Sequence, residues 1–250
     1  MASRDSCLVS RVHSSPCREP RRGVDGPDIL LLHYTGMTSC ERAIDWLSRP
    51  EAKVSCHYVI DMDGLITQMV PESLRAWHAG VSCWAGETDI NSRSIGFEIH
   101  NPGHDYGYPD FPDAQMAAVV ALAADVVTRW GIRPERVLAH SDIAPARKPD
   151  PGEKFDWHRL WLSGVGRWVP PVTVDERDPG LPPGACHDDI ALAQALLRTY
   201  GYGIDETGEL DLATQQVLIA FQRHFRPARV DGRLDRSTLM TLEQLVATVS

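Results

Sequence analysis

Residues 140–152, HSDIAPARKPDPG, combine three prolines with side chains that can bind a metal or transfer a proton. Prolines at this density exclude a helix, so we expect a loop to bring His140 and Asp150 together. The prolines also reduce the entropy lost when Lys148 and Asp150 are held in fixed places. A catalytic zinc usually takes three protein ligands of the histidine and carboxylate types and keeps a fourth position for water. His33, His140 and Asp150 would supply such a set.

Predicted strands bring two of these residues to the edge of a sheet. The apolar run DILLLHYT, residues 28–35, predicts a buried strand that ends close to His33. SIGFEIH (94–100) and RVLAHSD (136–142) predict two more strands, the second of which leads into the proline-rich segment. Functional groups collect at strand ends in sheet proteins, so this arrangement favours a shared site.

The remaining local patterns indicate an α/β fold. Residues 56–70 predict a hairpin, with the turn at DMDG between two strands. Thr38 and Glu41 form a possible capping box for a helix that continues to about Leu47. Residues 113–130 have the apolar periodicity of a long, largely buried helix that ends at a glycine. Helices between strands are typical of α/β sheet domains.

Composition changes after the first 162 residues. Residues 163–186 are rich in Pro and Gly and lack periodicity, which predicts a linker. Residues 187–250 follow a helical pattern and contain a weak repeat, TGELDLATQQVL (207–218) and DGRLDRSTLMTL (231–242). Each half of the repeat is a turn followed by an Asp- or Thr-capped helix, so we expect a small three-helix domain.

Charge and composition exclude several classes of protein. A net charge of −9 disfavours a nucleic-acid partner, which would require a basic face. The chain has no run of about 20 apolar residues that would predict a membrane span, and its N-terminal residues lack the apolar core of a signal peptide. We therefore expect a cytoplasmic protein, or a periplasmic or envelope protein if a leader is missing. Six scattered cysteines favour reduced thiols over a disulfide framework.

Five segments, in this order, resemble those of a known enzyme family: LLHYTG, CHYVID, AWHAG, SIGFEIHNPG and AHSDIAPARKPDPGEKFDW. The family is that of the zinc-dependent N-acetylmuramoyl-L-alanine amidases of the bacterial AmpD/AmiD type, and the resemblance covers about residues 24–162. These enzymes share a fold with peptidoglycan recognition proteins. The resemblance therefore implies a central mixed β-sheet flanked by helices, with residues 1–23 as an N-terminal extension.

The resemblance also implies a role for each candidate residue. By position in the motifs, His33, His140 and Asp150 would bind one Zn²⁺ per chain, in agreement with the set chosen from the residues themselves. Glu98 would be the general base and Lys148 would stabilise the oxyanion. Amide hydrolysis requires both, because water must lose a proton while negative charge develops on the carbonyl oxygen.

Four further residues are candidate substrate contacts. Trp77 and His78 match the family's substrate-contacting segment, and His78 would lie near the metal. Arg147 and Asn101 could bind carboxylates or amides of a stem peptide, since Arg presents a fork suited to carboxylate.

The sequence departs from some relatives at Cys56. Several phage amidases and recognition proteins have a Tyr there that is tied to catalysis, so its absence places more weight on Glu98. Cys56 and His57 are adjacent on a predicted strand and should point to opposite faces, which argues against a Cys–His nucleophilic pair. We expect His57 to be packed or to support a metal ligand.

Residues 187–248 resemble the three-helix type of peptidoglycan-binding domain, through YGYG, TGELDLAT and IAFQRHF. Together the two resemblances imply hydrolysis of the amide between N-acetylmuramic acid, or its anhydro form, and L-alanine of the stem peptide, in cell-wall turnover or recycling. The rival hypothesis is a non-catalytic peptidoglycan-binding protein of the same fold. Competent residues at all ligand positions favour the enzyme, with peptidoglycan or a muropeptide as its partner and no oligomeric state implied.

Overall fold

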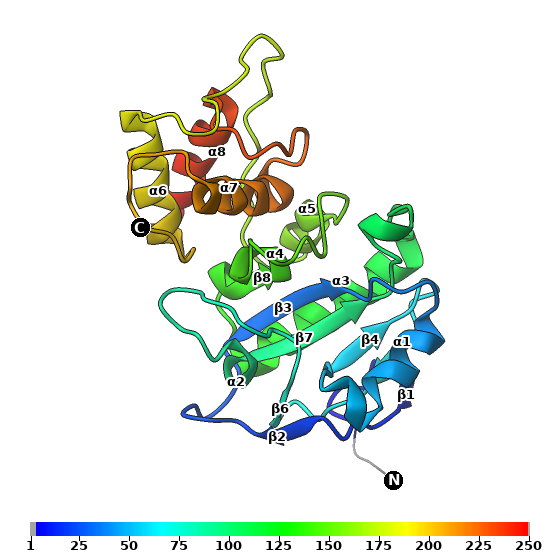
Figure 1. Cartoon of the computed structure of the whole chain (residues 1–250). Helices are drawn as coiled ribbons and strands as arrows, with labels where there is room; N and C mark the ends of the chain where they lie inside the picture. The colour runs from blue at the N-terminus through cyan, green and yellow to red at the C-terminus, as the bar shows by residue number, and fades with distance from the viewer. Residues whose placement is uncertain (1–3, 250) are drawn as a thin grey trace.

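The computed structural model describes residues 4–249 and places the run ILLLHY in a buried strand, β3 (Ile29–Tyr34) (Figure 1). This strand lies between β7 (Ser94–Ile99) and β8 (Val137–Ala139) and is parallel to both. Parallel strands covered on both faces are apolar throughout rather than alternating, which explains the continuous run of leucines. The strands predicted at residues 28–35 and 94–100 are thereby confirmed.

Six strands form the main sheet in the order β1-β5-β4-β7-β3-β8, with parallel and antiparallel neighbours. The predicted hairpin is present as β4 (Tyr58–Ile60) and β5 (Ile66–Gln68). Residues 4–23 of the predicted N-terminal extension add β1 (Arg11–Val12) at the sheet edge and β2 (Arg18–Pro20), which pairs with β6 (Leu74–Ala76). Residues 1–3 of that extension lie outside the described residues. The central mixed sheet expected from the sequence is confirmed.

Helices cover both faces of this sheet (Figure 1). The long helix α3 (Asp113–Trp130) packs its apolar stripe against one face, as the periodicity predicted. The opposite face is covered by α1 (Cys40–Leu47) over one part and by the C-terminal helices over another.

The capping residue of α1 is Ser39, whose Oγ accepts the Arg42 N–H, so the cap predicted at Thr38 is one residue too early. The shorter elements of this part of the chain are α2 (Ile90–Arg93), α5 (Trp157–Leu162) and the 3₁₀ turns Pro50–Ala52, His104–Tyr106 and Pro134–Arg136.

The segment after β8 differs from its prediction. We expected a strand over residues 136–142 and no helix beyond it, but the strand ends at Ala139 and a single helical turn, α4 (His140–Ile143), follows. The turn forms because the first proline, Pro145, lies beyond its last residue and removes none of its hydrogen bonds. His140 is therefore the first residue of a helical turn, whereas Asp150 is reached through a loop as expected.

Three helices make up the C-terminal domain: α6 (Asp188–Tyr200), α7 (Leu212–Phe225) and α8 (Arg236–Val246). The sequence repeat corresponds to two equivalent helix starts. Asp211 accepts the Thr214 N–H, and Asp235, 24 residues later, accepts the Thr238 N–H. The three-helix arrangement predicted from the sequence is therefore present.

The segment predicted as a linker, 163–186, contains no helix or strand apart from isolated bridges at its C-terminal end, within the described part of the chain. It is nevertheless bonded to the helical domain. The Val172 N–H donates to the Thr241 hydroxyl, and the Leu181 N–H donates to the Leu234 carbonyl. All six cysteines are free. Among the described residues no helix is long and apolar enough to span a membrane.

Candidate active site

His33 and Glu98 lie side by side on the central strands. They are register partners in β3 and β7, so their side chains project from the same face of the sheet. Their neighbours Leu32 and Phe97 point the other way, into the core beneath α3. The alternation of the two strands therefore places the candidate ligand and the candidate base together on the face that α3 does not cover.

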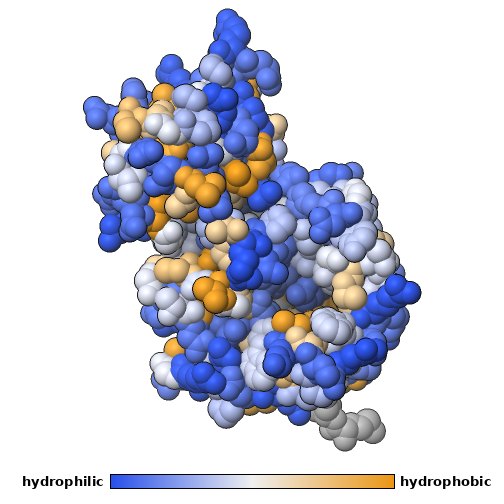
Figure 2. Space-filling model, viewed as in Figure 1, coloured by the Kyte–Doolittle hydropathy of each residue, from blue (hydrophilic) through white to orange (hydrophobic). Residues whose placement is uncertain are grey.

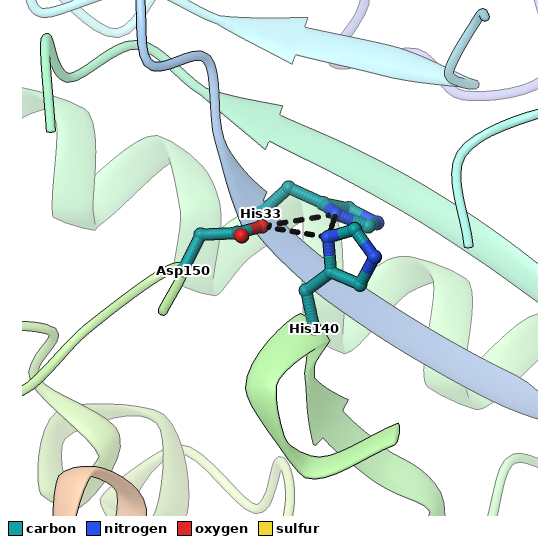
Figure 3. A group of neighbouring side chains, drawn as sticks. All are labelled: His33, His140 and Asp150. Atoms are coloured by element: carbon teal, nitrogen blue, oxygen red, sulfur yellow. Dashed lines mark hydrogen bonds and ion pairs between the residues drawn. The ribbon is translucent and has the colours of Figure 1, made fainter. Parts of the chain in front are cut away.

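Three candidate metal ligands converge at this point (Figure 3). His33 Nδ1 lies 2.8 Å from His140 Nδ1 and 3.2 Å from Asp150 Oδ2, and the last two atoms are 2.9 Å apart. Ligand atoms around a tetrahedral zinc with bonds of 2.0–2.1 Å lie about 3.3 Å from one another. All three side chains are buried, and one atom of each faces the shared point. The two histidines and one carboxylate therefore fit a zinc site.

The outer nitrogen of His140 shows which ring atom is free for a metal. His140 Nε2 lies 3.1 Å from the Ala79 carbonyl oxygen, which can only accept a hydrogen bond. Nε2 must therefore carry the proton, and Nδ1 keeps its lone pair toward His33 and Asp150. Metal-binding histidines usually donate their second N–H in this way.

His33 is oriented by a chain of side chains that leads to the same conclusion. The Ser94 hydroxyl donates to the Ile90 carbonyl at 2.7 Å, so its oxygen must accept from His78 Nε2 at 3.3 Å. His78 Nδ1 is then unprotonated and accepts from His33 Nε2 at 3.0 Å. His33 Nδ1 is left with a free lone pair that faces the other two ligands.

The AWHAG segment, 76–80, therefore supports both histidines of the candidate site, through the His78 ring and the Ala79 carbonyl. Asn91 Oδ1 holds this segment by accepting the backbone N–H groups of both residues at 2.8 Å. Gly96 in β7 leaves room for the His78 ring, because a Cβ there would lie 2.5 Å from His78 Nδ1. No sequence pattern pointed to Asn91 or to this use of Gly96. His78, expected to line the groove near the metal, is among the residues that line the pocket and also supports His33.

Burial and neighbouring charges together set the protonation states of His33, His78 and Asp150. Burial and the neighbouring His140 lower the pKa of His33 to about 4. Burial by itself raises the pKa of Asp150, but His140 and His33 hold it well below its usual range. Burial also lowers the pKa of His78 well below its ordinary value, and His33 adds to this shift. At neutral pH His33 and His78 are therefore neutral imidazoles and Asp150 is a carboxylate.

Glu98 has the properties of a general base. Burial raises its pKa well above the ordinary value, the nearby Asp150 raises it further, and Lys148 acts in the opposite direction. Its Oε2 atom is buried and has no hydrogen-bond partner among the described residues. A carboxylate in this setting takes up a proton more readily than one in water.

The three candidate ligands and Glu98 line one pocket of about 410 Å³. Lys148 and Trp77 both contribute to its wall, and the Trp77 Nε1–H is bonded to Glu19 of β2 at 3.1 Å. Arg147 also lines it, although its Nη2 atom donates to the carbonyls of Ala79 and Val81 at 2.8 Å. Figure 2 shows that the visible face of the sheet domain is mostly hydrophilic with a few apolar patches, and that further apolar patches lie on the helical domain and near the junction of the two.

Asn101 is placed differently from the sequence expectation. It is fully buried, its Nδ2 atom donates to the Pro109 carbonyl, and its Oδ1 atom accepts the Gly103 N–H. Because Asn101 is fully buried and is not among the residues that line the pocket, it orders the loop after β7 and does not face a substrate there.

Cys56 and His57 lie just before β4 and make separate contacts. Cys56 packs beneath α1 with Cys40 and Ile44, and burial raises the pKa of its thiol. His57 Nδ1 accepts the Gly96 N–H at 2.9 Å, and its ring lies behind that of His78, with centroids 5.6 Å apart. The two residues cannot form a nucleophilic pair, and His57 packs behind the residue that orients His33.

Comparisons with known proteins agree with this geometry. Residues 23–153 match the family model described as N-acetylmuramoyl-L-alanine amidase, and residues 186–242 match a peptidoglycan binding domain. The amidase AmiD of Escherichia coli is 36% identical over 231 residues, which cover 87% of this chain and 82% of the relative. The anhydro-muramyl amidase AmpD of the same species is 35% identical over 163 residues, 58% of this chain and 87% of the relative.

Solved structures extend the similarity to the whole fold. E. coli AmiD, in complex with anhydro-N-acetylmuramic acid-L-Ala-D-γ-Glu-L-Lys, superposes with a TM-score of 0.76 at 34% identity over 92% of this chain and 93% of that chain. AmpDh3 of Pseudomonas aeruginosa gives a TM-score of 0.75 at 33% identity over 92% and 95% of the two chains. The chain belongs to the N-acetylmuramoyl-L-alanine amidase family.

Proposed function

We propose that the protein hydrolyses the amide bond between N-acetylmuramic acid, or its anhydro form, and the L-alanine of a stem peptide. One Zn²⁺ held by His33, His140 and Asp150 would serve the reaction. The observation that carries this proposal is the fixed tautomer of both histidines, because their outer nitrogens are committed and three lone-pair atoms face one point. The substrates bound in the AmiD and AmpDh3 structures support the same chemistry.

Zinc at this site would supply Lewis-acid polarisation of the carbonyl and a lowered pKa for water. Glu98 takes the proton from the attacking water, since it shares the pocket with the candidate ligands and has a raised proton affinity. Protonated Glu98 then transfers that proton to the departing L-alanine nitrogen. Lys148 places a positive charge near the carbonyl oxygen as negative charge develops there.

We propose that Trp77 and Arg147 contact the substrate from the pocket wall. An indole can pack against a sugar or peptide face, and the part of the Arg147 guanidinium not engaged by Ala79 and Val81 can bind a carboxylate. The helical domain, 187–250, would bind peptidoglycan and raise the local concentration of cleavable bonds. Its match to a peptidoglycan binding domain supports this role.

Mass spectrometry of reaction products tests the proposed function. The protein is incubated with a soluble anhydro-muropeptide and, separately, with intact sacculi, and both reactions are repeated with a chelator. We expect an unmodified muramyl sugar and a free peptide that begins with L-alanine, and no such products with the chelator. Binding to sacculi without cleavage of either substrate would indicate a peptidoglycan-binding protein instead.

Comparison of the two substrates also shows whether free muropeptides or intact wall are preferred. Cell fractionation tests the predicted cytoplasmic location.

A further inference from the structure

The helical domain contacts the turn that carries the candidate ligand His140 through a buried carboxylate, Asp142, which is 1% exposed. Asp142 Oδ1 accepts the Tyr202 hydroxyl at 2.7 Å. Its Oδ2 atom accepts His224 Nδ1 at 2.7 Å and the Ala139 N–H at 2.8 Å. Two of these three donors belong to the helical domain, Tyr202 following α6 and His224 within α7.

The turn that contains Asp142 sets the position of two candidate ligands. His140 is the first residue of α4, and the Ser141 N–H donates to the Asp150 carbonyl at 3.0 Å. The Lys148 N–H donates to the carbonyl of Ala144, the residue that ends the turn. A single helical turn is not stable in isolation. Its orientation must therefore come from groups outside it, and Asp142 supplies the bonds that fix it.

The surrounding contacts show that the helical domain is packed against the sheet domain. The His224 ring stacks on Trp157, with centroids 3.6 Å apart, and Trp84 packs edge-on against Tyr202 at 4.9 Å. One apolar core joins both domains, from Leu31 and Ile143 to the α7 side chains. In Figure 1, α7 lies beside α4. Tyr202 and His224 both lie in motifs typical of peptidoglycan-binding domains, yet here they face inward and are buried, where a wall polymer cannot reach them.

We propose that the helical domain is a structural part of the active site, in which Tyr202 and His224 are positioning residues for the metal ligands. They hold Asp142, Asp142 holds α4, and α4 places His140 and Asp150. This inference rests on the proposed metal site and adds a second role to a domain otherwise assigned to wall binding. Loss of either donor leaves a buried oxygen of the Asp142 carboxylate with one hydrogen bond fewer, which is unfavourable. The α4 turn shifts in response.

Metal affinity of the full-length protein tests this proposal without reliance on activity. Zinc affinity is measured by competition with a chromophoric chelator, and the geometry of the site by the visible absorption of the Co²⁺-substituted protein. We expect Tyr202→Phe to weaken zinc binding by about tenfold, the lower end of the range for groups that support metal ligands, and to alter the Co²⁺ spectrum. Turnover of a soluble muropeptide should show a lower kcat with KM changed less than twofold.

Matched variants separate positioning from general destabilisation. Tyr200→Phe removes a hydroxyl from the same interface that makes no bond to Asp142, so it should leave affinity and spectrum unchanged. His224→Leu removes a donor and should weaken zinc binding. His224→Asn loses the same ring stacking but keeps an N–H near the position of Nδ1, so it should restore most of the affinity.

Two results would overturn the inference. If Tyr202→Phe and His224→Leu match the wild type in zinc affinity and Co²⁺ spectrum and lose only thermal stability, the domain contact is structural alone. If the wild-type protein neither binds zinc nor cleaves the muropeptide, the proposed function fails first and the inference fails with it. Only the first result, with an active wild-type enzyme, speaks against the positioning role by itself.

Discussion

The candidate ligands come from two different scaffolds. His33 projects from β3, an interior strand that pairs with β7 on one side, where Glu98 is the register partner of His33, and with β8 on the other. His140 comes from a helical turn and Asp150 from a proline-rich loop, and Asp142 of that turn is bonded to residues 60 and 82 positions away. The comparison indicates that one side of the site is held within the sheet, whereas the other side also has hydrogen bonds from a distant domain.

Removal of a ligand from the loop should have the largest effect. Asp150→Ala deletes the carboxylate, and we expect zinc affinity to fall by more than the 10–100-fold typical of supporting groups, with activity lost in parallel. Metal content after dialysis, measured by atomic emission, checks this. Asp110→Ala, which removes an exposed carboxylate from another loop, serves as control. An Asp150→Ala protein that retains a full equivalent of zinc would exclude Asp150 as a ligand.

Changes to the residues that act on substrate should separate chemistry from metal binding. Glu98→Gln should keep zinc and lower kcat by about 10²–10⁴-fold, the usual contribution of a general base. Lys148→Ala should also keep zinc and lower kcat by about 10²–10³-fold, as for loss of one oxyanion donor. Steady-state kinetics together with metal content measure both effects. Wild-type turnover by Glu98→Gln would assign the base elsewhere.

Loss of His78, which supports the strand-borne ligand His33, should weaken zinc binding less than loss of a ligand. His78→Ala removes the acceptor for His33 Nε2, so zinc affinity should fall by about 10–100-fold. His78→Asn retains an acceptor near the position of Nδ1 and should recover part of this loss. Chelator competition measures both variants. Equal affinities for His78→Ala and wild type would show that the sheet alone holds His33.

Acidification should have the smallest effect and should act mainly on the sheet side of the site. Burial is the main cause that lowers the pKa of His33 to about 4, and His140 adds to it. Burial also lowers the pKa of His57 to about 3, with a further contribution from Arg21. The pKa of His78 is lowered in the same way. Between pH 6.5 and about 4 these three histidines bind protons in the unfolded chain but not in the folded protein. The free energy of unfolding therefore falls as the pH is lowered. The raised pKa of Glu98 opposes this for one group.

The net change should therefore be a loss on the order of 3 kcal/mol between pH 7 and pH 5, since three histidines each contribute about 1.4 kcal/mol per pH unit below 6.5 and Glu98 opposes this by at most about 1.4 kcal/mol per pH unit. Urea unfolding of the metal-free protein at both pH values measures it. Unchanged or increased stability at pH 5 would contradict the assignment of neutral buried histidines.

The sequence predicted the strand-borne half of the site better than the rest. A run of leucines that ends in His33 and the register of SIGFEI follow from local periodicity, and both strands formed as expected. The turn at His140 was missed because four residues carry too little periodicity to be separated from the strand before them. Local sequence patterns could not predict the roles of Asn91 and Ser94 or the contacts of Asp142. Each depends on residues that tertiary packing brings together.

The linker prediction shows the same limit. Composition correctly indicates a segment with little regular structure at 163–186, but it carries no information on what that segment and the helices after it pack against. Burial of Trp84 between the domains depends on Gly201, where a Cβ would lie 2.7 Å from the indole. Such close contacts between distant positions are defined only once the fold is known.

Metal dependence of amide hydrolysis tests the central claim most directly. The purified protein is stripped with a chelator, assayed on an anhydro-muropeptide, and assayed again after addition of one equivalent of Zn²⁺. We predict that hydrolysis is lost on stripping, returns with a stoichiometry of one zinc per chain, and does not return in Asp150→Ala. Full hydrolysis by the stripped protein would contradict the assignment of His33, His140 and Asp150 as a catalytic zinc site.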